Sequence, residues 1–429
     1  MGVGSVAALE PAELLRERRE RLEKAYANRA PDRVPLTLLP APDLAASYAG
    51  LTTEEFCFSW EAQVRVAEKW GSDFNVEGVD SLPYFVPGLE MYLLLLAWVE
   101  KPEVAAWARF LMGPFHDILQ DKYTKWPGRE LAPTAHPQFT GGKFMEADEY
   151  RFLAEDPLGF VNERVLPRAF GLLSRGRAEL YPALVKLGVE LQNFSATMAK
   201  VGSLSAQLGY PSFPTGWGYA PLDLISDFLR YPTHTMLDLR RHPDDVKAAV
   251  ESLTPVLRRC VRASTPPPEV AEKAFGTRTV LVFFPLHLNE MLPPKLFEEF
   301  YWPSLREVVQ EALSLGAKPW IFFEGNFTPF LHYLEDLPKG RVVAWFERTD
   351  LRRAREALGD HVVLMGGLPL SLLMHGSREK VYEEACKLLT EVKEPGGFIF
   401  AGGQASPTAA TRIENLWAVI EATLACGRY

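Results

Sequence analysis

Acidic, imidazole and amide side chains follow directly after several short apolar runs of this sequence. The candidates for chemistry are His287, Asn289 and Glu290 after TVLVFFPL (279 to 286), Glu324 and Asn326 after KPWIFF (318 to 323), and Glu347 after RVVAWF (341 to 346). Carboxylates that converge with a histidine can transfer protons or hold a divalent metal ion. The sequence therefore predicts a catalytic site where these runs end.

Glu324 is the clearest of these candidates. It ends the run WIFF without an adjacent cation, and Gly325 after it permits a tight turn. A carboxylate in that position needs a distant partner, so we expect Glu324 to act as a metal ligand or as a general acid-base group. We expect His287 to be a ligand or proton carrier, and Glu347 to be the third catalytic residue.

Structural roles are the alternative for several candidates. His287 could be a hydrogen-bonded core histidine, and Asp80 could cap the next helix or turn. Glu347, Arg348 and Asp350 could form an ion-pair network between loops, and for Arg348 with Asp350 this is the favoured interpretation.

Parallel strands joined by helices would bring these residues together, because their carboxyl ends meet at one edge of the sheet. The second half alternates apolar runs with amphipathic helical stretches, and the predicted strands there are 279–286, 318–323, 341–346, 361–366 and 397–402. Three earlier segments, 33–39, 72–79 and 199–208, would complete eight strands. The fold class is therefore α/β, a (β/α)8 TIM-type barrel.

A single barrel domain spanning 1–429 accommodates the whole chain. Its first part, 1–32, is a charged helical segment, and 81–195 is too long for one crossover and rich in aromatic residues and proline. We expect 81–195 to be a mostly helical insertion in the N-terminal half that covers the mouth as a lid or wall.

Substrate-orienting groups are expected near the predicted strand ends. They are Glu77, Asp80, Tyr84, Gln207, Asn289, Asn326 and Gln404. Aromatic residues of the insertion would form an apolar cover above them. These are Tyr84, Phe85, Trp98, Trp107, Phe115 and Trp126.

Composition excludes several classes of protein. The 429 residues carry a formal charge of -9, which argues against a nucleic-acid binder. The longest apolar run, 91–99, is about half of what a membrane-spanning helix needs, so we expect a buried helix and no stable membrane insertion. The N-terminus lacks the apolar core of a signal peptide, which favours the cytoplasm.

Cysteine spacing and the absence of standard motifs exclude further classes of protein. Four cysteines lie far apart without a C-x-x-C pair, so we expect free thiols in a reducing compartment. The chain has neither a G-x-G-x-x-G after a strand nor a P-loop, and therefore no nucleotide cofactor is expected. H-E-x-x-H and G-x-S-x-G are also missing.

Three segments of the C-terminal half carry a family resemblance: LPPKLFEEFYWPSLREVVQEALSLGAKPWIFFEGN, TDLRRAREALGDHVVLMGGLPLSLLMHGSREKVYEEACKLL and GGFIFAGG. Weaker matches at RVPL and SLSAQLGY extend it over most of the chain. The sequence resembles the uroporphyrinogen decarboxylase superfamily, which also contains zinc-dependent methyltransferases that serve corrinoid proteins or thiols. The resemblance implies a (β/α)8 barrel with a deep cleft at the carboxyl ends of the strands.

Departures from this family fall on the residues of its chemistry. Decarboxylating members carry an Arg-Gln-Ala-Gly-Arg-like segment after the first strand, whereas this chain has LPAPDLAASYAG, so true uroporphyrinogen decarboxylation is not expected. Methyltransferases carry His-x-Cys-Gly-Asn after the fifth strand and a further Cys after the eighth. Here Phe322, Glu324 and Gly403 stand at those positions, and Gly325 and Asn326 remain.

A metal in this chain would need other ligands. The tentative set is Glu324, His287 and Glu290, with Glu77 as a further candidate. Zinc accepts nitrogen and oxygen donors of this kind, and another divalent metal is the alternative.

The leading hypothesis is an enzyme of the methyltransferase branch. It would pass a methyl or similar group between a small, partly apolar substrate and a thiol or a corrinoid protein, which would be a partner that holds the corrinoid. The alternatives are a metal-free lyase or decarboxylase in the same cleft, and a ligand-binding protein that has lost catalysis. Barrels of this size often dimerise, so a homodimer is also expected.

Overall fold

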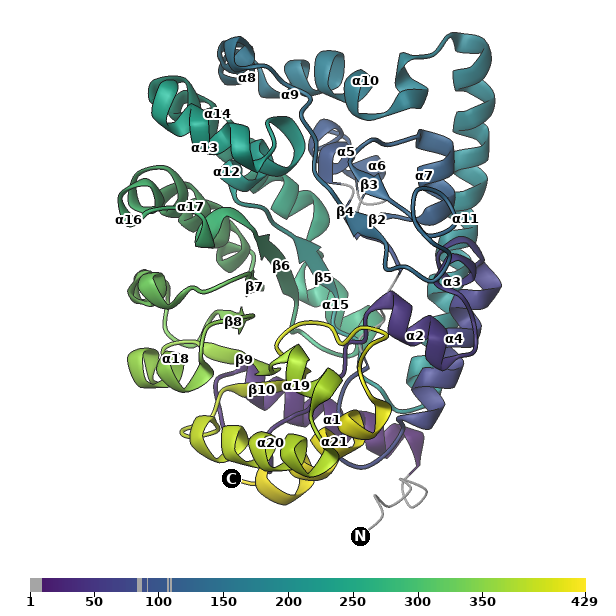
Figure 1. Ribbon diagram of the computed structural model, residues 1–429, viewed down its shortest axis with the longest axis vertical. Coiled ribbons are helices and arrows are strands. Elements are labelled where there is room, and N and C mark those ends of the chain that lie inside the picture. The colour runs from purple at the N-terminus through teal and green to yellow at the C-terminus, as the bar shows by residue number, and fades with distance from the viewer. Residues whose placement is uncertain (1–9, 83–86, 91, 106–107, 109) are drawn as a thin grey trace.

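A parallel sheet of six strands forms the centre of the protein (Figure 1). The computed structural model describes residues 10–82, 87–90, 92–105, 108 and 110–429. Strand order follows the chain, so each strand pairs with the next one in sequence. The strands are β5 (Thr215–Trp217), β6 (Leu281–Leu286), β7 (Lys318–Phe323), β8 (Val343–Phe346), β9 (Val363–Leu368) and β10 (Phe398–Gly403).

Helices connect these strands and cover their outer face (Figure 1). After β5 come α12 (Pro221–Leu224), η4 (Ile225–Leu229), α13 (Pro232–Arg241), α14 (Pro243–Ser264) and α15 (Pro268–Phe275), and after β6 come η5 (Leu288–Glu290), α16 (Pro294–Leu296), η6 (Phe297–Tyr301) and α17 (Trp302–Ser314). The later connections are η7 (Thr328–Asp336), α18 (Leu351–Leu358), α19 (Leu370–His375) and α20 (Arg378–Val392), and α21 (Ile413–Cys426) follows β10.

The N-terminal half is mostly helical. It begins with α1 (Pro11–Tyr26), α2 (Pro42–Tyr48), α3 (Thr53–Phe58) and α4 (Trp60–Asp73). The expected insertion contains β1 (Leu89–Glu90), α5 (Tyr92–Ala97), α6 (Pro102–Ala105), β2 (Phe110–Leu111), α7 (Gly113–Leu119), β3 (Thr124–Lys125), β4 (Gln138–Phe139), η1 (Ala147–Glu149), α8 (Tyr150–Glu155), α9 (Pro157–Phe160), η2 (Val161–Val165), α10 (Leu166–Ala169), η3 (Gly171–Ser174) and α11 (Arg177–Gln207). Two antiparallel pairs, β1 with β2 and β3 with β4, lie within it.

Two short segments continue the parallel arrangement beyond β10. Leu36 bridges Phe400, and Thr37 bridges Ser81, both in parallel. The described residues do not show the closure of a barrel between Ser81 and β5. The established architecture is an α/β fold with a curved parallel sheet and many helices.

The five C-terminal strands were predicted within two residues, but two N-terminal strand predictions are wrong. Residues 199–208 lie largely in α11, whose buried positions Leu187, Phe194 and Val201 recur every seven residues and so line one helical face. Residues 72 and 73 end α4, and the strand-like bridge falls later, at Ser81. The strand missed by the prediction is β5, only three residues long.

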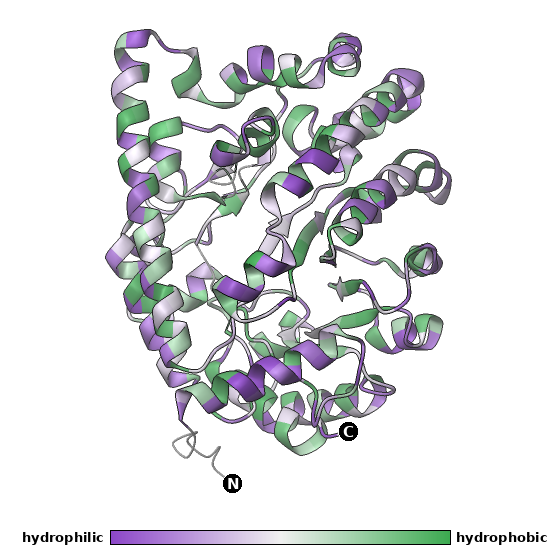
Figure 2. Cartoon of the chain, turned by 180° about the vertical axis from the view of Figure 1, so that it is seen from behind, coloured by the Kyte–Doolittle hydropathy of each residue, from purple (hydrophilic) through white to green (hydrophobic). Residues whose placement is uncertain are grey.

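Alternate residues of the strands face two different cores. Val343, Trp345, Val363, Met365 and Ile399 share one buried cluster on the inner face of the sheet. Their neighbours, such as Ala344 and Phe346, pack in the larger cluster with the helices. Figure 2 shows the matching pattern on the helices, where hydrophilic residues lie along the outer surface.

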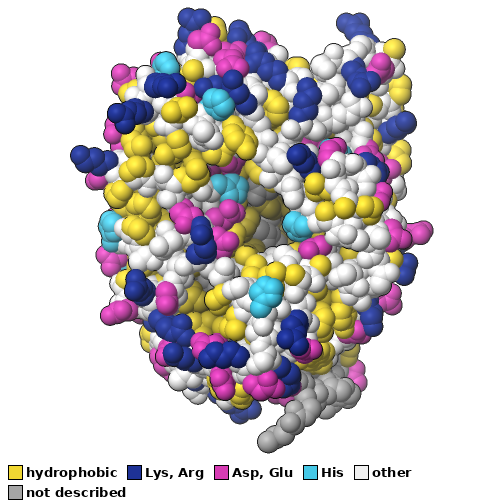
Figure 3. Space-filling model, in the orientation of Figure 1, with side chains coloured by type: hydrophobic (Ala, Val, Ile, Leu, Met, Phe, Trp, Pro, Cys, Tyr) yellow, Lys and Arg dark blue, Asp and Glu magenta, His cyan; other side chains and the backbone are white. Residues whose placement is uncertain are grey.

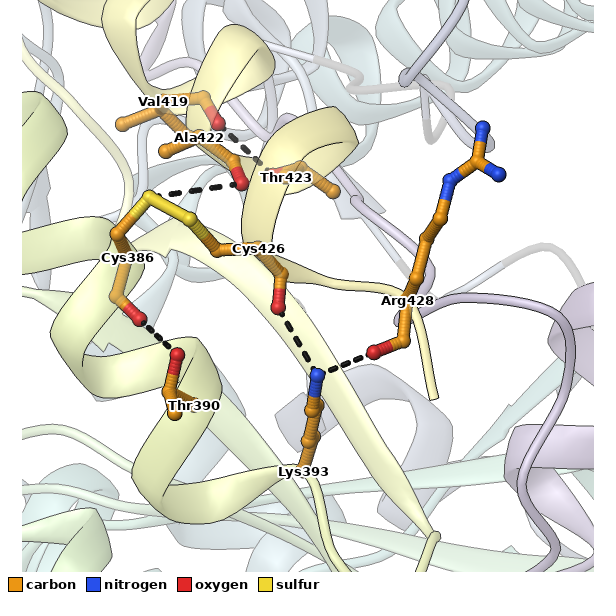
Figure 4. Close-up of a disulfide and its surroundings, with 8 residues drawn as sticks. All are labelled: Cys386, Thr390, Lys393, Val419, Ala422, Thr423, Cys426 and Arg428. Carbon is orange, nitrogen blue, oxygen red and sulfur yellow. Dashed lines mark hydrogen bonds between the residues drawn. A yellow bond between two sulfur atoms is a disulfide. The ribbon is translucent and has the colours of Figure 1, made fainter.

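The expectation of four free thiols is wrong for two of them. Cys386 and Cys426 form a disulfide that joins α20 to α21 (Figure 4), while Cys57 and Cys260 are free and buried. The two bonded residues are 40 positions apart in sequence, and the packing of α20 beside α21 brings them together. Sequence spacing could not reveal that proximity.

The apolar run at 91–99 contributes to α5, whose residues Tyr92 to Leu96 are buried. Across the part of the chain that the structure describes, no helix combines the length and apolar character needed to span a membrane.

Candidate active site

The three predicted catalytic residues lie at one level of the sheet. Pro285, Phe322 and Trp345 form one row across β6, β7 and β8. Side chains return to the same face every second residue, so the positions two residues further point inward above this row. Those positions hold His287, Glu324 and Glu347.

His287 lies between two carboxylates. Its Nδ1 atom is hydrogen-bonded to Asp227, and its Nε2 atom is 3.1 Å from Oε1 of Glu324. Asp227 is almost completely buried at 4% side-chain exposure, His287 is 23% exposed, and Glu324 is 39% exposed. The arrangement therefore runs from a buried acid, through an imidazole, to an acid that solvent and ligands can reach.

Asp227 lies in η4, a π-helical turn, and was not among the sequence candidates. The Tyr219 hydroxyl donates a 2.6 Å hydrogen bond to Asp227 Oδ2, and the same hydroxyl is 3.4 Å from His287 Nδ1. Turns of this kind within helices often occur at functional sites. Asp227 and Tyr219 hold the imidazole ring in one orientation.

The environment of His287 favours its protonated form. Burial alone would lower its pKa, but the charge and hydrogen bond of Asp227, together with Glu324, raise the pKa well above 6.5. The two carboxylates therefore favour the imidazolium form, in which an Nε2 proton is directed at Glu324. This is the arrangement of a proton donor that faces a cleft.

Asp223 is a second acid beneath the site that sequence reasoning missed. It is completely buried and accepts hydrogen bonds from the backbone N–H of Leu288 at 2.9 Å and the hydroxyl of Tyr301 at 2.6 Å. Burial, and then the charge of Asp227, raise its pKa to about 7. Asp223 also accepts the His287 N–H at 3.3 Å and so positions the start of the loop after β6.

A sequence signal for both missed acids exists in PLDLISD (221 to 227). Asp223 and Asp227 are four residues apart, which places them on one side of a helix. They follow β5 directly, so they would have been candidates had that strand been placed at 215–217.

The turn after β7 is fixed by contacts from both neighbouring loops. Asn289 donates from Nδ2 to the carbonyl of Glu324 at 2.8 Å, and the N–H of Gly325 donates to Glu347 Oε2 at 2.7 Å. Gly325 has a positive φ of 70°, a conformation that glycine adopts without strain. In this structure Asn289 and Glu347 position the backbone beside Glu324.

The donors expected for a metal do not form a complete set of ligands. Glu290 forms an ion pair with Arg348, and both ring nitrogens of His287 already contact carboxylates. In the described ranges, no three His, Cys, Asp or Glu side chains are grouped so that they could hold a metal ion. The residues present do not fit the expected zinc set.

The expected ion pair between Arg348 and Asp350 does not form. Arg348 contacts Glu290 and lies 4.0 Å from Glu347, whereas the side chain of Asp350 caps α18.

Several expected substrate-orienting residues are exposed or are held in other contacts. Asp80 is completely buried and pairs with Arg33 and Arg21 at 2.6 Å each, because it precedes the strand-like segment at Ser81 instead of ending a strand. Glu77 is exposed in the turn before it, next to Gly78, which packs against α21.

Gln207 is exposed at the end of α11. Asn326 is exposed and accepts hydrogen bonds from the N–H and hydroxyl of Thr328. Tyr84, Phe85 and Trp107 lie outside the described residues. No observation assigns a substrate role to any of these side chains.

A hollow opens on the face shown in Figure 3, with hydrophobic side chains around it and acidic and histidine side chains at its edge. A pocket of about 430 Å³ lies beside the ends of β8 and β9, and its lining includes Glu347, Arg348 and Gln404. The insertion contributes Phe139, whose ring lies 6.3 Å from that of His287 at an angle of 28°. Phe115 and Trp126 are instead completely buried within the insertion.

These features define the class of the protein as an α/β fold with a parallel sheet and an acid-imidazole-acid arrangement near the carboxyl ends of its strands. The family model for uroporphyrinogen decarboxylase (URO-D) matches residues 185–425. The chain belongs to this family.

Two kinds of known protein are similar to this chain, one in sequence and one in fold. Uroporphyrinogen decarboxylases from strains of Coxiella burnetii are 29% identical over 136 residues, which covers 31% of this chain and 37% of theirs. The matched part thus spans little more than a third of the curated relatives. A methyltransferase from Methanosarcina mazei has a similar fold, with a TM-score of 0.56 and 17% identity over 95% of this chain and 98% of that one.

Proposed function

We propose that this protein is an enzyme that protonates a small, partly apolar substrate while a methyl or related group passes between it and a corrinoid protein or a thiol. The observation that carries the proposal is the Asp227–His287–Glu324 arrangement at the mouth of the sheet. The fold shared with a methyltransferase along nearly the whole chain supports the choice of methyl transfer.

A leaving oxygen or sulfur atom needs a proton when its bond to a methyl group breaks. In this step the electron pair of the corrinoid or thiolate acceptor forms the new bond to the methyl carbon, and the old bonding pair remains on the leaving atom. The Nε2 proton of His287 moves to that atom. Asp227 holds the imidazole from the Nδ1 side, and Glu324 accepts from Nε2 until the substrate arrives. General acid catalysis of this kind contributes about 10² to 10⁴-fold in rate.

Decarboxylation is the second candidate, favoured by the family match and the curated relatives. The same proton would then be delivered to the carbon atom that loses carbon dioxide, without a corrinoid partner or a metal. Both reactions use the His287–Glu324 pair, and the substrate distinguishes them.

A binding protein without catalysis is the third candidate. A pair between Glu324 and Arg348 would favour it, because the acid would then be neutralised in a structural contact. Instead, Arg348 contacts Glu290 and Glu347, and Glu324 contacts His287. These contacts support an enzyme.

The test supplies purified protein with methanol, dimethyl sulfide or methoxybenzene as methyl donor and cob(I)alamin or a thiol as acceptor, and with uroporphyrinogen in a separate reaction. We expect methyl transfer from at least one donor, and a loss of about 100-fold or more in His287→Gln and Glu324→Gln. The matched controls, His332→Gln in η7 and Glu307→Gln in α17, are both exposed and should keep full activity. Full activity of His287→Gln would contradict the proposal, and turnover of uroporphyrinogen alone would replace it with decarboxylation.

A further inference from the structure

A continuous row of aromatic side chains lines the inner face of β5 to β8, directly beneath the charged residues. Ring centroids are 5.4 Å apart for Trp217 and Phe283, 5.0 Å for Phe283 and Trp320, and 5.7 Å for Trp320 and Trp345. Phe322 lies 4.4 Å from Trp345 in the upper row. The floor of the site is therefore formed by Phe322 and Trp345.

Phe322 is the accessible part of this floor, whereas Trp345 beside it is buried, at 4% exposure, and rigidly held. Phe322 is half-buried, whereas its neighbour Phe323 is completely buried on the opposite face of the strand. The indole N–H of Trp345 donates a 3.0 Å hydrogen bond to the carbonyl of Gln404, which fixes the plane of its ring. A ligand that enters the hollow would meet aromatic surfaces whose orientation is already set.

Aromatic side chains also reach the site from the insertion. Phe139 of β4 stacks beside the ring of His287, and Phe110 of β2 packs edge-on against Trp217 at 5.2 Å. A planar group held next to His287 would therefore have an aromatic neighbour in Phe139.

The charges around the floor disfavour an anionic ligand. Glu324 and Glu347 are 39% and 29% exposed, and the cationic His287 is paired with Asp227. Arg348 is already paired with Glu290. Carboxylate groups on a ligand would meet these acids without a free cation supplied by this set of residues.

We propose that the site selects a substrate with an uncharged aromatic ring, which lies against Phe322 and the small exposed part of Trp345 and directs its reacting substituent to the His287–Glu324 pair. This rests on the proposed function and specifies its substrate class. Aromatic rings attract one another in offset or edge-on geometry beyond their area of contact. A saturated ring of equal size has no such interaction.

The experiment measures binding by titration calorimetry with phenol, its saturated counterpart cyclohexanol, and benzene-1,3,5-tricarboxylate. We expect phenol to bind about tenfold more tightly than cyclohexanol, as two ring contacts predict, and the tricarboxylate to bind more weakly than phenol. Phe322→Leu, which removes one of the two ring contacts, should weaken phenol binding about threefold. The matched control, Phe323→Leu, removes the same ring from the helix-facing side and should leave phenol binding unchanged.

A measurement on the unaltered chain guards against misfolded variants. With 5-fluorotryptophan incorporated, phenol should shift the fluorine resonance of Trp345 and leave that of Trp302 in α17 unchanged. Equal binding of phenol and cyclohexanol, tighter binding of the tricarboxylate, no binding of any probe, or an unmoved Trp345 signal would overturn the proposal. Because His287→Gln should still bind phenol, loss of turnover in that variant tests the proton donor and not the aromatic floor.

Discussion

An alanine in place of Gly325 would meet two separate obstacles next to the candidate acid Glu324. The backbone of Gly325 has a φ of 70°, and a residue with a side chain loses about 1–2 kcal/mol of stability in this conformation. Its Cβ atom would also lie 2.1 Å from Oε2 of Glu290 and 2.4 Å from Cδ of the same carboxylate. Glu290 must therefore leave its contact with Arg348, an exposed pair whose loss costs about 0–1 kcal/mol.

These two contributions predict that Gly325→Ala destabilises the protein by about 1–3 kcal/mol. The effect on activity should be larger, because any shift of this turn carries Glu324 away from His287 Nε2, now 3.1 Å from its Oε1 atom. Misplacement of a catalytic group by about 1 Å can lower a rate by about 100-fold.

Gly50→Ala is the matched control. Gly50 has nearly the same φ, 72°, but an added Cβ atom would have no neighbour within 4 Å. Denaturant unfolding and turnover should be measured for both variants. We expect similar losses of unfolding free energy, within about 1 kcal/mol, but a loss of turnover only in Gly325→Ala. Equal turnover of the two variants would refute the assignment of the turn to the site.

Three further predictions concern stability. Replacing Cys386 and Cys426 with serine should lower the unfolding free energy by up to about 4 kcal/mol, since the disulfide closes a 40-residue segment. Denaturant midpoints that are the same with and without reductant would contradict the disulfide. Asp80→Asn should lower the unfolding free energy by about 3–5 kcal/mol, because it leaves buried arginine charge unpaired. The protein that remains folded should keep its KM. A raised KM at full stability would instead support a role of Asp80 in substrate binding. The raised folded-state pKa of His287 stabilises the fold fully below pH 6.5, and this contribution is lost as pH rises through the folded value. Asp223 acts with the same sign, with a contribution lost as pH rises through about 7, so stability should fall from acidic to alkaline pH. His287→Gln should flatten the fall measured by denaturation at a series of pH values, and an equal slope in that variant would contradict the shift.

The C-terminal strands could be predicted because each is a compact apolar run between polar helices. His287, Glu324 and Glu347 follow from the same pattern, since Phe283, Phe322 and Trp345 mark the inward phase of the strands and the acids and histidine stay in phase. The apolar runs predicted the strands, and the polar residues that follow them gave the candidates at the strand ends.

The N-terminal half was harder to predict because its strand-like segments are very short. β5 has three residues, and the segments at Leu36 and Ser81 form only isolated bridges. Such segments carry no period that distinguishes them from loops, and the predicted strand at 199–208 lies largely in α11. That misplacement hid Asp223 and Asp227.

Ion pairs and disulfides between residues distant in the chain could not be predicted from the sequence either. The structure pairs Glu290 with Arg348 and Asp80 with Arg33, contacts that residue type and spacing do not predict. The disulfide between Cys386 and Cys426 depends in the same way on the packing of two helices. Residue type and spacing do not encode these contacts directly.

The protonation state of His287 tests the central claim most directly. With histidines labelled at 13Cε1, the resonance of His287 can be assigned by its loss in His287→Gln and followed by NMR as pH is varied. We predict that His287 stays protonated well above pH 6.5 and that Asp227→Asn lowers its pKa. Titration of His287 at or below pH 6.5, or a pKa unaffected by Asp227→Asn, would contradict the account.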